Sequence, residues 1–542
     1  MGKGNLTRGA SVMVAMVTLA KVLGLIYIIP LTRIIHEEGL GIYGQAYNFY
    51  IILNTLSTSG FPTAMAKLIS ERLALKRYGD VEQMYRLTIR IVFVLGVILF
   101  VVMWVGAPLY SHLVALKEPA EGAEAMTMSI RALSFALLVV PVMSALRGYL
   151  QGFQEMEPSA YSQALEQFVR VIAIVVGAYV VVKQGGSIAA GAAAATFGAV
   201  VGALAGVLLL MAAVVPLRRS FLRQTRSSRT SESAKRTVHA MFQIGMPVSL
   251  GNLVIPFSGL VDSLTVQNML MFSGYSFATA TAAYGILSRQ AMQLIQLPLA
   301  FAGALGVAIL PALAESKALG DKRAIHTRIT GTIRSMMFMT LPVAASLLVL
   351  AAPIDEIWAG NHKGAVIISS VCFMSIFSSL ELISTFMLQG LGKMYRPVRN
   401  MMIGVGVKLV FNLILIPPFH ILGAAIATTI GYIVSSTLNV LAVKKYGQVR
   451  FSVWRLTAPS TFATIFLCVT LAVGSWAGFH LGNVLTHAAF AVASIQIVVS
   501  IGLGGIVYVW LSIVFGAVSG PELARVPLVG RPLSRFAPSK AR

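Results

Sequence analysis

Long apolar runs separated by short polar stretches make up most of this chain. A helix needs about 20 consecutive, mostly apolar residues to cross the hydrocarbon core of a membrane. The chain has about fourteen such runs, which predicts an all-α polytopic membrane protein. The eleventh and twelfth runs lie so close together that their shared turn must be tight, and Pro417, Pro418 and Gly423 suit such a turn. The runs lie near 9–32, 44–66, 89–114, 128–149, 160–182, 187–216, 239–265, 279–311, 331–353, 364–389, 400–419, 421–443, 457–479 and 488–516.

Short motifs from the first half of the chain recur in the same order in the second half, between 232 and 241 residues later. We interpret them as a duplication of a six-span unit. Six spans return the chain to its starting side, so the predicted repeats, spans one to six and seven to twelve, are parallel. Internal duplication is typical of transporters whose halves rock about a central site. The paired motifs are Leu150-Gln151-Gly152 with Leu388-Gln389-Gly390, Ala46-Tyr47 with Ala283-Tyr284, Gly79-Asp80 with Gly320-Asp321, and Gly191-Ala192-Ala193 with Gly423-Ala424-Ala425.

The repeats and the polar stretches together predict five segments. Spans thirteen and fourteen lie outside the duplication and are an addition to it. The C-terminal tail is Pro-rich and basic, and no structure is assigned to it. The segments are an N-terminal six-helix lobe (1–216), a basic cytoplasmic linker (217–238), a C-terminal six-helix lobe (239–445), two additional transmembrane helices (446–517) and a cytoplasmic tail (518–542).

The charge distribution supports a membrane protein and sets its orientation. Hydrophobic residues make up 57% of the chain and charged residues only 11%, which excludes an ordinary soluble protein. The net charge of +23 does not indicate nucleic acid, because the basic residues lie in short loops between apolar runs. There they act as topology signals and contacts for anionic membrane lipids. The basic loops fall on alternate connections, which predicts that both termini lie in the cytoplasm.

The chain lacks the patterns expected of an enzyme. Cys372 and Cys468 both lie inside apolar runs, and the histidines show no metal-ligand spacing, so no disulfide, metal or cofactor is predicted. Gly392-Lys393 lacks the remaining residues of a phosphate-binding loop. No polar segment is long enough for a catalytic domain. We therefore predict a non-enzymatic protein.

Polar residues in span five lie on one helical face. Gln163, Glu166, Gln167 and Arg170 follow the spacing i, i+3, i+4, i+7, and Glu166 can pair with Arg170 along the helix. Ionisable groups inside a membrane usually face a cavity or a partner. Two interpretations are open: the pair locks helix packing, or it contacts the cargo and gates its movement.

Glycines in span six predict a packing surface. Gly198, Gly202 and Gly206 form a ridge of small residues at helical spacing. Such ridges let neighbouring membrane helices approach closely.

Span eleven carries Lys408 and Asn412 on one face, with Gly404 one turn before them. Lys408 follows Arg170 by 238 residues, the same offset as the repeated Leu-Gln-Gly, so the two cations occupy equivalent places. Lys408 either pairs with Asp262 or Glu381 on other spans, or stands as a fixed positive charge in a central cavity.

Two more predicted spans carry a basic residue deep in their apolar run. Arg289 and Gln293 share a face of span eight, with Gln296 one turn later, and Lys21 lies in span one. Four spans thus bring a deep cation, whereas the deep acids are Glu166, Asp262 and Glu381. A cavity with net positive charge suits an anionic group, and arginine offers planar, multidentate donors to phosphate oxygens.

These residues also carry a family resemblance, which covers spans one to twelve and extends to the whole chain. The chain resembles the stage V sporulation protein B and polysaccharide biosynthesis family, within the multidrug/oligosaccharidyl-lipid/polysaccharide exporter superfamily. That family is similar to the flippases that move lipid-linked peptidoglycan precursors or polysaccharide units across the bacterial cytoplasmic membrane. The matching residues are Arg147-Gly148-Tyr149-Leu150-Gln151-Gly152, Met156, Pro158, Gln163, Glu166, Gln167, Arg170, Asp262, Tyr284-Gly285, Pro298, Pro311, Leu388-Gln389-Gly390-Leu391-Gly392-Lys393, Pro397 and Asn400.

The resemblance implies a V-shaped bundle of two six-helix lobes that works by alternating access. It also implies that two extra C-terminal helices form a groove for the lipid tail, and spans thirteen and fourteen match that pair in number and place. In the peptidoglycan-precursor flippases, arginines of the first lobe meet the pyrophosphate. This chain has one deep cation in span one, Lys21.

The leading hypothesis is a flippase for a polyprenyl-pyrophosphate-linked precursor. Glu166, Asp262 and Glu381 are the candidates for gating or ion coupling. One alternative is a multidrug or cation antiporter that uses Asp262 and Glu381. Another is a non-transporting scaffold that recruits envelope-synthesis enzymes through 217–238, although that loop is better explained as a topology signal. The predicted substrate-binding residues are Lys21, Arg170, Arg289, Gln293, Lys408 and Asn412.

Overall fold

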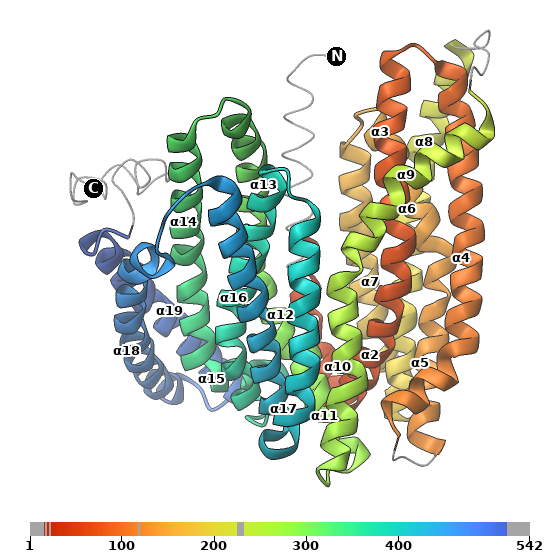
Figure 1. The fold of residues 1–542 in the computed structure, drawn as a ribbon. Helices are drawn as coiled ribbons and strands as arrows, with labels where there is room; N and C mark the ends of the chain where they lie inside the picture. The colour runs from red at the N-terminus through yellow and green to blue at the C-terminus, as the bar shows by residue number, and fades with distance from the viewer. Residues whose placement is uncertain (1–15, 17–18, 21–22, 117–119, 225–231, 518–542) are drawn as a thin grey trace. The chain divides into compact units, whose positions relative to one another are not determined.

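The computed structural model describes residues 16, 19–20, 23–116, 120–224 and 232–517 (Figure 1). Every regular element among these residues is helical. The chain forms two compact units, Met1–Gly285 and Ile286–Arg542, which we call the first and second units. Lys21, part of the predicted linker and the predicted tail lie outside the described residues.

Ten helices of the first unit have both ends among the described residues. α5 and α6 meet at Phe135, and α9 and α10 meet at Leu253, so each pair forms one bent apolar segment. α2 reverses direction at His36, which has a φ of 55°, and the hydroxyls of Tyr27 and Tyr43 meet at 3.2 Å across the reversal. The helices are α2 (Ile28–Thr58), α3 (Gly60–Ala74), α4 (Tyr78–Val114), α5 (Ala120–Ser134), α6 (Ala136–Gly152), α7 (Glu157–Lys183), α8 (Ile188–Gln224), α9 (Ala234–Asn252), α10 (Val254–Phe272) and α11 (Phe277–Gly285).

The second unit begins with a π-helical turn. α16 lies at its centre, against α13, α14 and α17, and an apolar core of Ile, Leu, Met and Val side chains fills the space between them. The elements are η1 (Ile286–Ala291), α12 (Met292–Leu294), α13 (Gln296–Ala318), α14 (Lys322–Val349), α15 (Ala351–Ala359), α16 (Ala365–Gly390), α17 (Tyr395–Gly447), α18 (Val453–Leu485) and α19 (Ala489–Val514).

α17 is a helical hairpin. Its backbone leaves the helical region at His420, where φ is 51°, two residues after Pro418. Asn400 donates a hydrogen bond to Asn439 at 2.9 Å, and a Cβ on Gly404 would lie 2.6 Å from the carbonyl oxygen of Gly431. These pairs converge on His420, so 395–419 and 421–447 run antiparallel. The tight turn predicted between the eleventh and twelfth runs is confirmed.

Eleven segments of the described chain are long and apolar enough to span a membrane. Three of the predicted runs are not separate members of that set. The run near 9–32 is only partly within the described residues. The run near 44–66 is divided between α2 and α3 at Ser59, and the two runs that form the α17 hairpin count as one segment, Tyr395–Gly447.

The glycine ridge of α8 packs against α7, as the sequence predicts. A Cβ on Gly198 would lie 2.7 Å from the backbone nitrogen of Ile174. One on Gly202 would lie 2.6 Å from Cβ of Arg170 and 2.7 Å from the carbonyl oxygen of Glu166. Only glycine permits backbones to lie this close, so the ridge fixes the face of α7 that carries the charged pair.

The two C-terminal helices, α18 and α19, pack against each other. A Cβ on Gly474 would lie 2.8 Å from Cα of Ser500, and one on Gly478 would lie 2.6 Å from Cα of Gln496. Tyr508 of α19 donates a hydrogen bond to the carbonyl oxygen of Phe338 in α14 at 2.8 Å. α18 and α19 are therefore joined to the rest of the second unit through α14.

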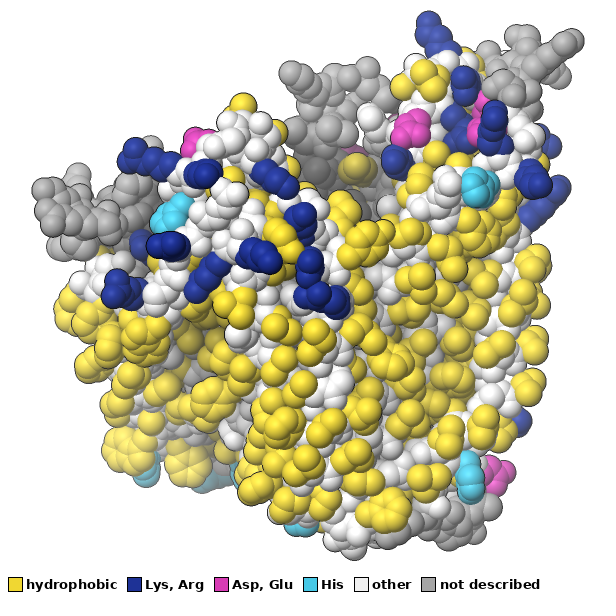
Figure 2. Space-filling model, viewed as in Figure 1, with side chains coloured by type: hydrophobic (Ala, Val, Ile, Leu, Met, Phe, Trp, Pro, Cys, Tyr) yellow, Lys and Arg dark blue, Asp and Glu magenta, His cyan; other side chains and the backbone are white. Residues whose placement is uncertain are grey.

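Basic side chains gather at one end of each unit, and apolar side chains cover the sides below them (Figure 2). In the first unit, the ends of the predicted linker are held at this basic end. Arg218 of α8 donates to both carboxylate oxygens of Glu82 in α4, at 3.0 and 2.5 Å. The separation of basic ends from apolar sides is the pattern expected of a membrane protein.

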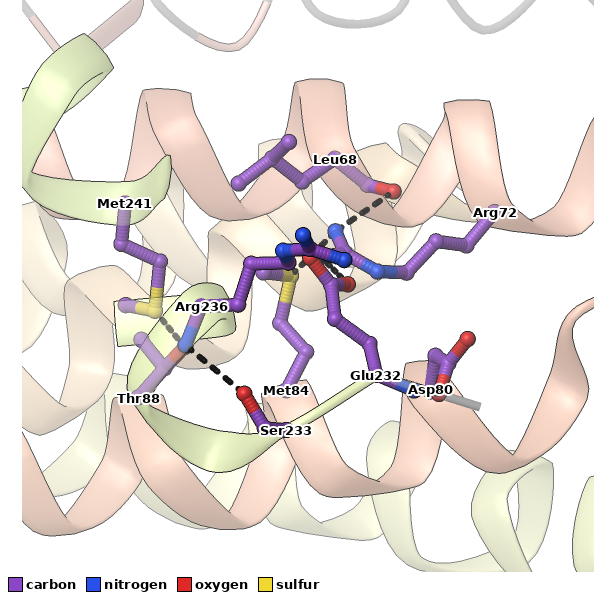
Figure 3. A network of polar contacts seen from close by, with 9 residues as sticks. All are labelled: Leu68, Arg72, Asp80, Met84, Thr88, Glu232, Ser233, Arg236 and Met241. Carbon is purple, nitrogen blue, oxygen red and sulfur yellow. Dashed lines mark hydrogen bonds and ion pairs between the residues drawn. The ribbon is translucent and has the colours of Figure 1, made fainter. Parts of the chain in front are cut away.

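The other end of the linker is held by a buried arginine (Figure 3). Arg72 of α3 pairs with Glu232 at 2.5 Å and also contacts the carbonyl oxygen of Leu68 at 3.3 Å. The backbone nitrogen of Glu232 donates to Asp80 of α4 at 3.1 Å, and Ser233 caps α9. The start of α9 is thereby attached to α3 and α4 within the first unit.

Candidate functional site

A cluster of three charged side chains lies inside the first unit, which we call the charged triad. Glu166 of α7 accepts hydrogen bonds from Arg170, one turn later, and from Arg147 of α6, at 2.8 Å. The Nε of Arg147 also donates to Ser162 at 3.0 Å. The three side chains are largely buried. One carboxylate faces two guanidinium groups, so the triad carries a net charge of +1.

Local packing explains why the triad forms. The i, i+4 spacing places Glu166 and Arg170 on one face of α7, as the sequence predicts. Gly148, next to Arg147, lies against α3, where a Cβ would meet the carbonyl oxygen of Pro62 at 2.6 Å. Gly202 of α8 packs against Arg170 from the other side. The arginines are therefore held by the backbone contacts of α6 and α8.

Sequence reasoning missed Arg147 as a site residue, although it is part of the family motif. The available signal was an arginine inside the apolar run 128–149, with no acid near it on its own helix. Such a residue needs a partner on another helix. Because Arg147 also contacts Glu166, the Glu166–Arg170 pair has a third charged side chain beside it.

Aromatic side chains of α2 lie beside the triad. Tyr43 and Tyr47 stack with ring centroids 5.8 Å apart, and Tyr50 meets Tyr47 edge-on at 5.5 Å. All three are close enough to Arg170 to interact with its charge. The triad thus lies between α6, α7 and α8, with the phenol groups of α2 beside it.

A second polar network joins α2 to α10 and α11, and we call it the polar seam. Gln45 donates to Gln267 at 3.0 Å, and Gln267 donates to Thr281 at 2.7 Å. One turn along α2, Asn48 donates to Ser263 at 2.9 Å and to Tyr284. The seam consists of Gln45, Asn48, Ser263, Gln267, Thr281 and Tyr284.

Glycines allow the helices of the polar seam to approach. A Cβ on Gly285 would lie 2.5 Å from the carbonyl oxygen of Glu37 and 2.6 Å from the nitrogen of Gly41. Asp262, a predicted gating residue, precedes Ser263 in α10 and is buried. The structure therefore places Asp262 next to the seam.

In the second unit, Lys408 and Asn412 are buried on the first helix of the α17 hairpin, and only 3% of Lys408 is exposed. A Cβ on Gly431, in the second helix, would lie 3.1 Å from Cβ of Lys408. Gly202 packs against Cβ of Arg170 in the same way in the first unit. The two cations predicted to be equivalent therefore share a local setting, in which a glycine of the next helix packs against the base of the side chain.

Within the described chain, Glu381 of α16 accepts hydrogen bonds only from uncharged side chains. Its Oε1 accepts from Thr385 at 3.0 Å and from Asn439 at 3.3 Å, and Asn439 in turn accepts from Asn400 at 2.9 Å. Within the described chain, no Lys or Arg forms an ion pair with it. A buried carboxyl group without a cation is stable when it holds a proton or binds a small cation.

Arg289 and Gln293 lie at the start of the second unit, Arg289 in η1 and Gln293 in α12. The helical face predicted for them does not continue to Gln296, because the helix is interrupted at Ile295 and Gln296 is exposed at the start of α13. Single π-helical turns inside membrane helices often occur at functional sites. Both Arg289 and Gln293 are partly buried.

The structure thus groups the predicted site residues within each unit. Glu166 and Arg170 meet directly, Asp262 lies by the polar seam, and Lys408 and Asn412 share one helix. Glu381 lies in a separate network with Asn439. Lys21 lies outside the described residues.

Two proteins of Bacillus subtilis (strain 168) are similar in sequence to this chain over nearly its whole length. The chain is 26% identical to the lipid II flippase MurJ of Bacillus subtilis (strain 168) over 518 residues. The alignment covers 93% of this chain and 94% of that protein. The chain is also 26% identical over 550 residues to stage V sporulation protein B of the same organism, covering 99% of this chain and 100% of that protein.

Solved structures show the same fold. A multidrug resistance MATE family transporter of the MOP superfamily, in an inward-facing conformation, aligns with a TM-score of 0.65 at 14% identity, over 80% of this chain and 94% of that one. The lipid II flippase MurJ, in an inward closed conformation, aligns with a TM-score of 0.64 at 15% identity, over 93% and 98%. The sequence profile of the family described as polysaccharide biosynthesis protein matches residues 6–317, more than half of the chain. The chain therefore belongs to the polysaccharide biosynthesis protein family, as its motifs predict.

Proposed function

We propose that this protein is a flippase, which moves a polyprenyl-pyrophosphate-linked cell-envelope precursor across the cytoplasmic membrane by alternating access. The precursor would be a peptidoglycan or polysaccharide unit. The observation that carries the proposal is the charged triad, in which two buried arginines share one carboxylate. Membership of the polysaccharide biosynthesis protein family and similarity to a lipid II flippase support the same class of substrate.

The triad suits a pyrophosphate for a physical reason. Glu166 holds Arg147 and Arg170 in place, so their guanidinium groups are oriented before an anion arrives. Arginine binds phosphate oxygens through planar, multidentate hydrogen bonds. An arriving pyrophosphate would accept hydrogen bonds from the arginine donors that now face Glu166. The Glu166 carboxylate would lose those bonds, and α7, which carries it, could then shift when substrate is bound. Glu166 would thus act in gating and Arg170 in binding.

Lys408 and Asn412 would serve the same purpose in the second lobe. Lys408 has the local packing of Arg170, and Asn412 offers an amide one turn away. Arg289 and Gln293 would add donors from the π-helical turn, and Lys21 from span one. The headgroup would pass through the lobes while the polyprenyl tail stays in lipid. No covalent step is needed.

Ion coupling would use the buried acids. Glu381 of α16 accepts hydrogen bonds from Thr385 on the same helix and from Asn439 of the α17 hairpin. Binding or release of a proton or small cation at Glu381 would change the hydrogen bonds that hold the hairpin to α16. Asp262, beside the polar seam, would be the corresponding acid of the first unit.

The proposed layout is fourteen spans in two parallel six-helix repeats that form a V-shaped bundle, plus two added helices. The repeated Leu-Gln-Gly supports it, because both copies end a helix in the same way. The nitrogen of Glu155 bonds to the carbonyl oxygen of Leu150 at 2.9 Å, and that of Lys393 bonds to Leu388 at 2.8 Å. We retain the segment boundaries predicted from the sequence and the cytoplasmic position of both termini.

Reconstituted vesicles test the proposed function. The purified chain is inserted into liposomes with a fluorescent pyrophosphate-linked polyprenyl glycan, and the accessible fraction is scored with a membrane-impermeant quencher. We expect accessibility to rise only in vesicles that contain the protein. A matched lipid whose headgroup has no phosphate should not move. Equal movement of both lipids, or none of either, would contradict the proposal.

A cation antiporter is the second candidate, favoured by one observation. Glu381 is a buried carboxyl group that only neutral donors contact within the described chain, as expected of a site for a proton or small cation. Growth of an expressing strain on cationic drugs distinguishes the two functions. Resistance that depends on Glu381, without precursor movement in vesicles, would favour the antiporter.

A further inference from the structure

An apolar groove runs between α4 and α9 on the first unit. Its volume is about 410 Å³. Ile91, Val94 and Ile98 of α4 form one wall, and Val238 and Phe242 of α9 form the other. The charged triad and the polar seam contribute no residue to it, so this groove is separate from the sites described above.

The apolar walls face outward. Val94 is 55% exposed, Ile98 53% and Phe242 40%. The groove lies in a segment of α4 that is long and apolar enough to span a membrane. An outward-facing apolar concavity at this position is filled by lipid hydrocarbon, because polar occupants would be desolvated there without hydrogen-bond partners.

One cation lines the groove, Arg90. It is the last charged residue of α4 before an uninterrupted apolar stretch. Arg90 is exposed and forms no ion pair with a carboxylate of the described chain. By contrast Arg86, one turn earlier, pairs with Glu82 at 3.2 Å. A guanidinium without an anion therefore stands where the polar end of the helix meets hydrocarbon.

We propose that this groove binds an anionic glycerophospholipid of the cytoplasmic leaflet. The phosphodiester would accept hydrogen bonds from Arg90, and one acyl chain would lie along Ile91, Val94 and Ile98 against Phe242. A single guanidinium matches the single negative charge of a phosphodiester, whereas a pyrophosphate would need further cations. A long cationic side chain at the membrane surface also attracts anionic lipid electrostatically.

The bound lipid would have a structural consequence. α9 follows the linker directly and packs on α3, where Gly60 and Gly245 meet. An acyl chain in the groove would add contacts between α4 and α9 on the outer side. The lipid would therefore hold α9, where the second predicted repeat begins, against α4.

Photo-crosslinking tests the proposal without reference to flipping. The full-length protein is reconstituted in phosphatidylcholine with a trace of phosphatidylglycerol that carries a photoreactive acyl chain, or with the matched photoreactive phosphatidylcholine. Crosslinked peptides are mapped by mass spectrometry. We expect the phosphatidylglycerol probe to label 87–98 and 238–242 several-fold more than the phosphatidylcholine probe.

Matched variants assign the labelling to the groove. Arg90→Ala should reduce phosphatidylglycerol labelling to the level of phosphatidylcholine, whereas Arg86→Ala, which removes a neighbouring cation already paired with Glu82, should leave it unchanged. Val238→Trp should fill the groove and reduce labelling by both probes. Equal labelling by the two probes in the unmodified protein would overturn the proposal, as would Arg90→Ala without effect. Displacement of the phosphatidylglycerol probe by polyprenyl phosphate, but not by unlabelled phosphatidylglycerol, would also overturn it.

Discussion

At the scale of single residues, Glu166 is the central residue of the charged triad, since it orients two arginines from different helices. The spacing of Glu166 and Arg170 could be predicted from the sequence, because both lie on one helix. Arg147 could not be assigned, since its contact depends on how α6 packs against α7. A periodic pattern along one helix does not contain that information.

Replacing Glu166 by Gln should destabilise the protein and alter its charge balance. The change leaves two guanidinium groups without their carboxylate in a largely buried place. Removing one partner of such a network typically costs about 3 kcal/mol or more. We expect a loss of that size in unfolding experiments in mixed micelles.

The control for this substitution is Glu71→Gln, which removes the carboxylate of an exposed pair with Lys67. An exposed pair contributes about 0–1 kcal/mol, so stability should hardly change. Equal effects of the two substitutions would mean that the triad does not hold α6 and α7 together.

At the scale of elements, glycines decide which helices approach. The ridge of α8 was predicted from its spacing, and the structure places it against the charged face of α7. The π-helical turn at Ile286–Ala291 was not predicted, and it breaks the regular spacing expected for span eight. A one-residue change in helical pitch depends on tertiary packing and leaves no periodic signal.

Gly202→Leu should move α8 away from α7 and displace Arg170. A Cβ alone would lie 2.6 Å from that of Arg170, so a larger side chain cannot be accommodated without a backbone shift. Overpacking of this kind costs about 1–3 kcal/mol. We expect lower thermal stability and loss of precursor movement in vesicles.

Gly331→Ala in α14 is the matched control, because a Cβ added there would have no neighbouring atom within 4 Å. Alanine favours helix over glycine by about 1 kcal/mol, so this variant should be slightly more stable and fully active. If Gly202→Leu behaved like Gly331→Ala, the packing of α8 on α7 would not position Arg170.

The polar seam gives a further prediction at this scale. In the predicted layout α2 belongs to the first repeat and α10 to the second, so we expect alternating access to separate them in one state. Cysteines replacing Asn48 and Ser263, whose side chains meet at 2.9 Å, should form a disulfide in a background lacking Cys372 and Cys468. Oxidation should stop precursor movement and reductant should restore it. Full movement in the oxidised protein would show that the seam need not open.

At the scale of the whole molecule, the class of fold could be predicted from the sequence. The apolar runs identify the helices, and the motifs identify the family. The extent of the first compact unit depends on contacts between distant helices, which the sequence does not reveal. The first compact unit extends to Gly285, beyond the linker, because α9, α10 and α11 contact α2, α3 and α4. Contacts such as Arg72 with Glu232 join residues far apart in the chain, and no local pattern indicates them.

The central claim is that buried cations in both predicted lobes bind the anionic linkage of the substrate. Vesicle transport by Arg170→Ala, Lys408→Ala and the double variant tests it most directly. Arg328→Ala, which removes a cation paired with Glu315 at 3.3 Å, serves as the control.

Loss of a charged hydrogen bond to phosphate corresponds to about 1.5–3 kcal/mol, or on the order of tenfold or more in transport at limiting substrate. We expect each single variant to lose that much, with the control unchanged and all variants folded by size-exclusion chromatography. Transport at the unmodified rate by both Arg170→Ala and Lys408→Ala would contradict the account.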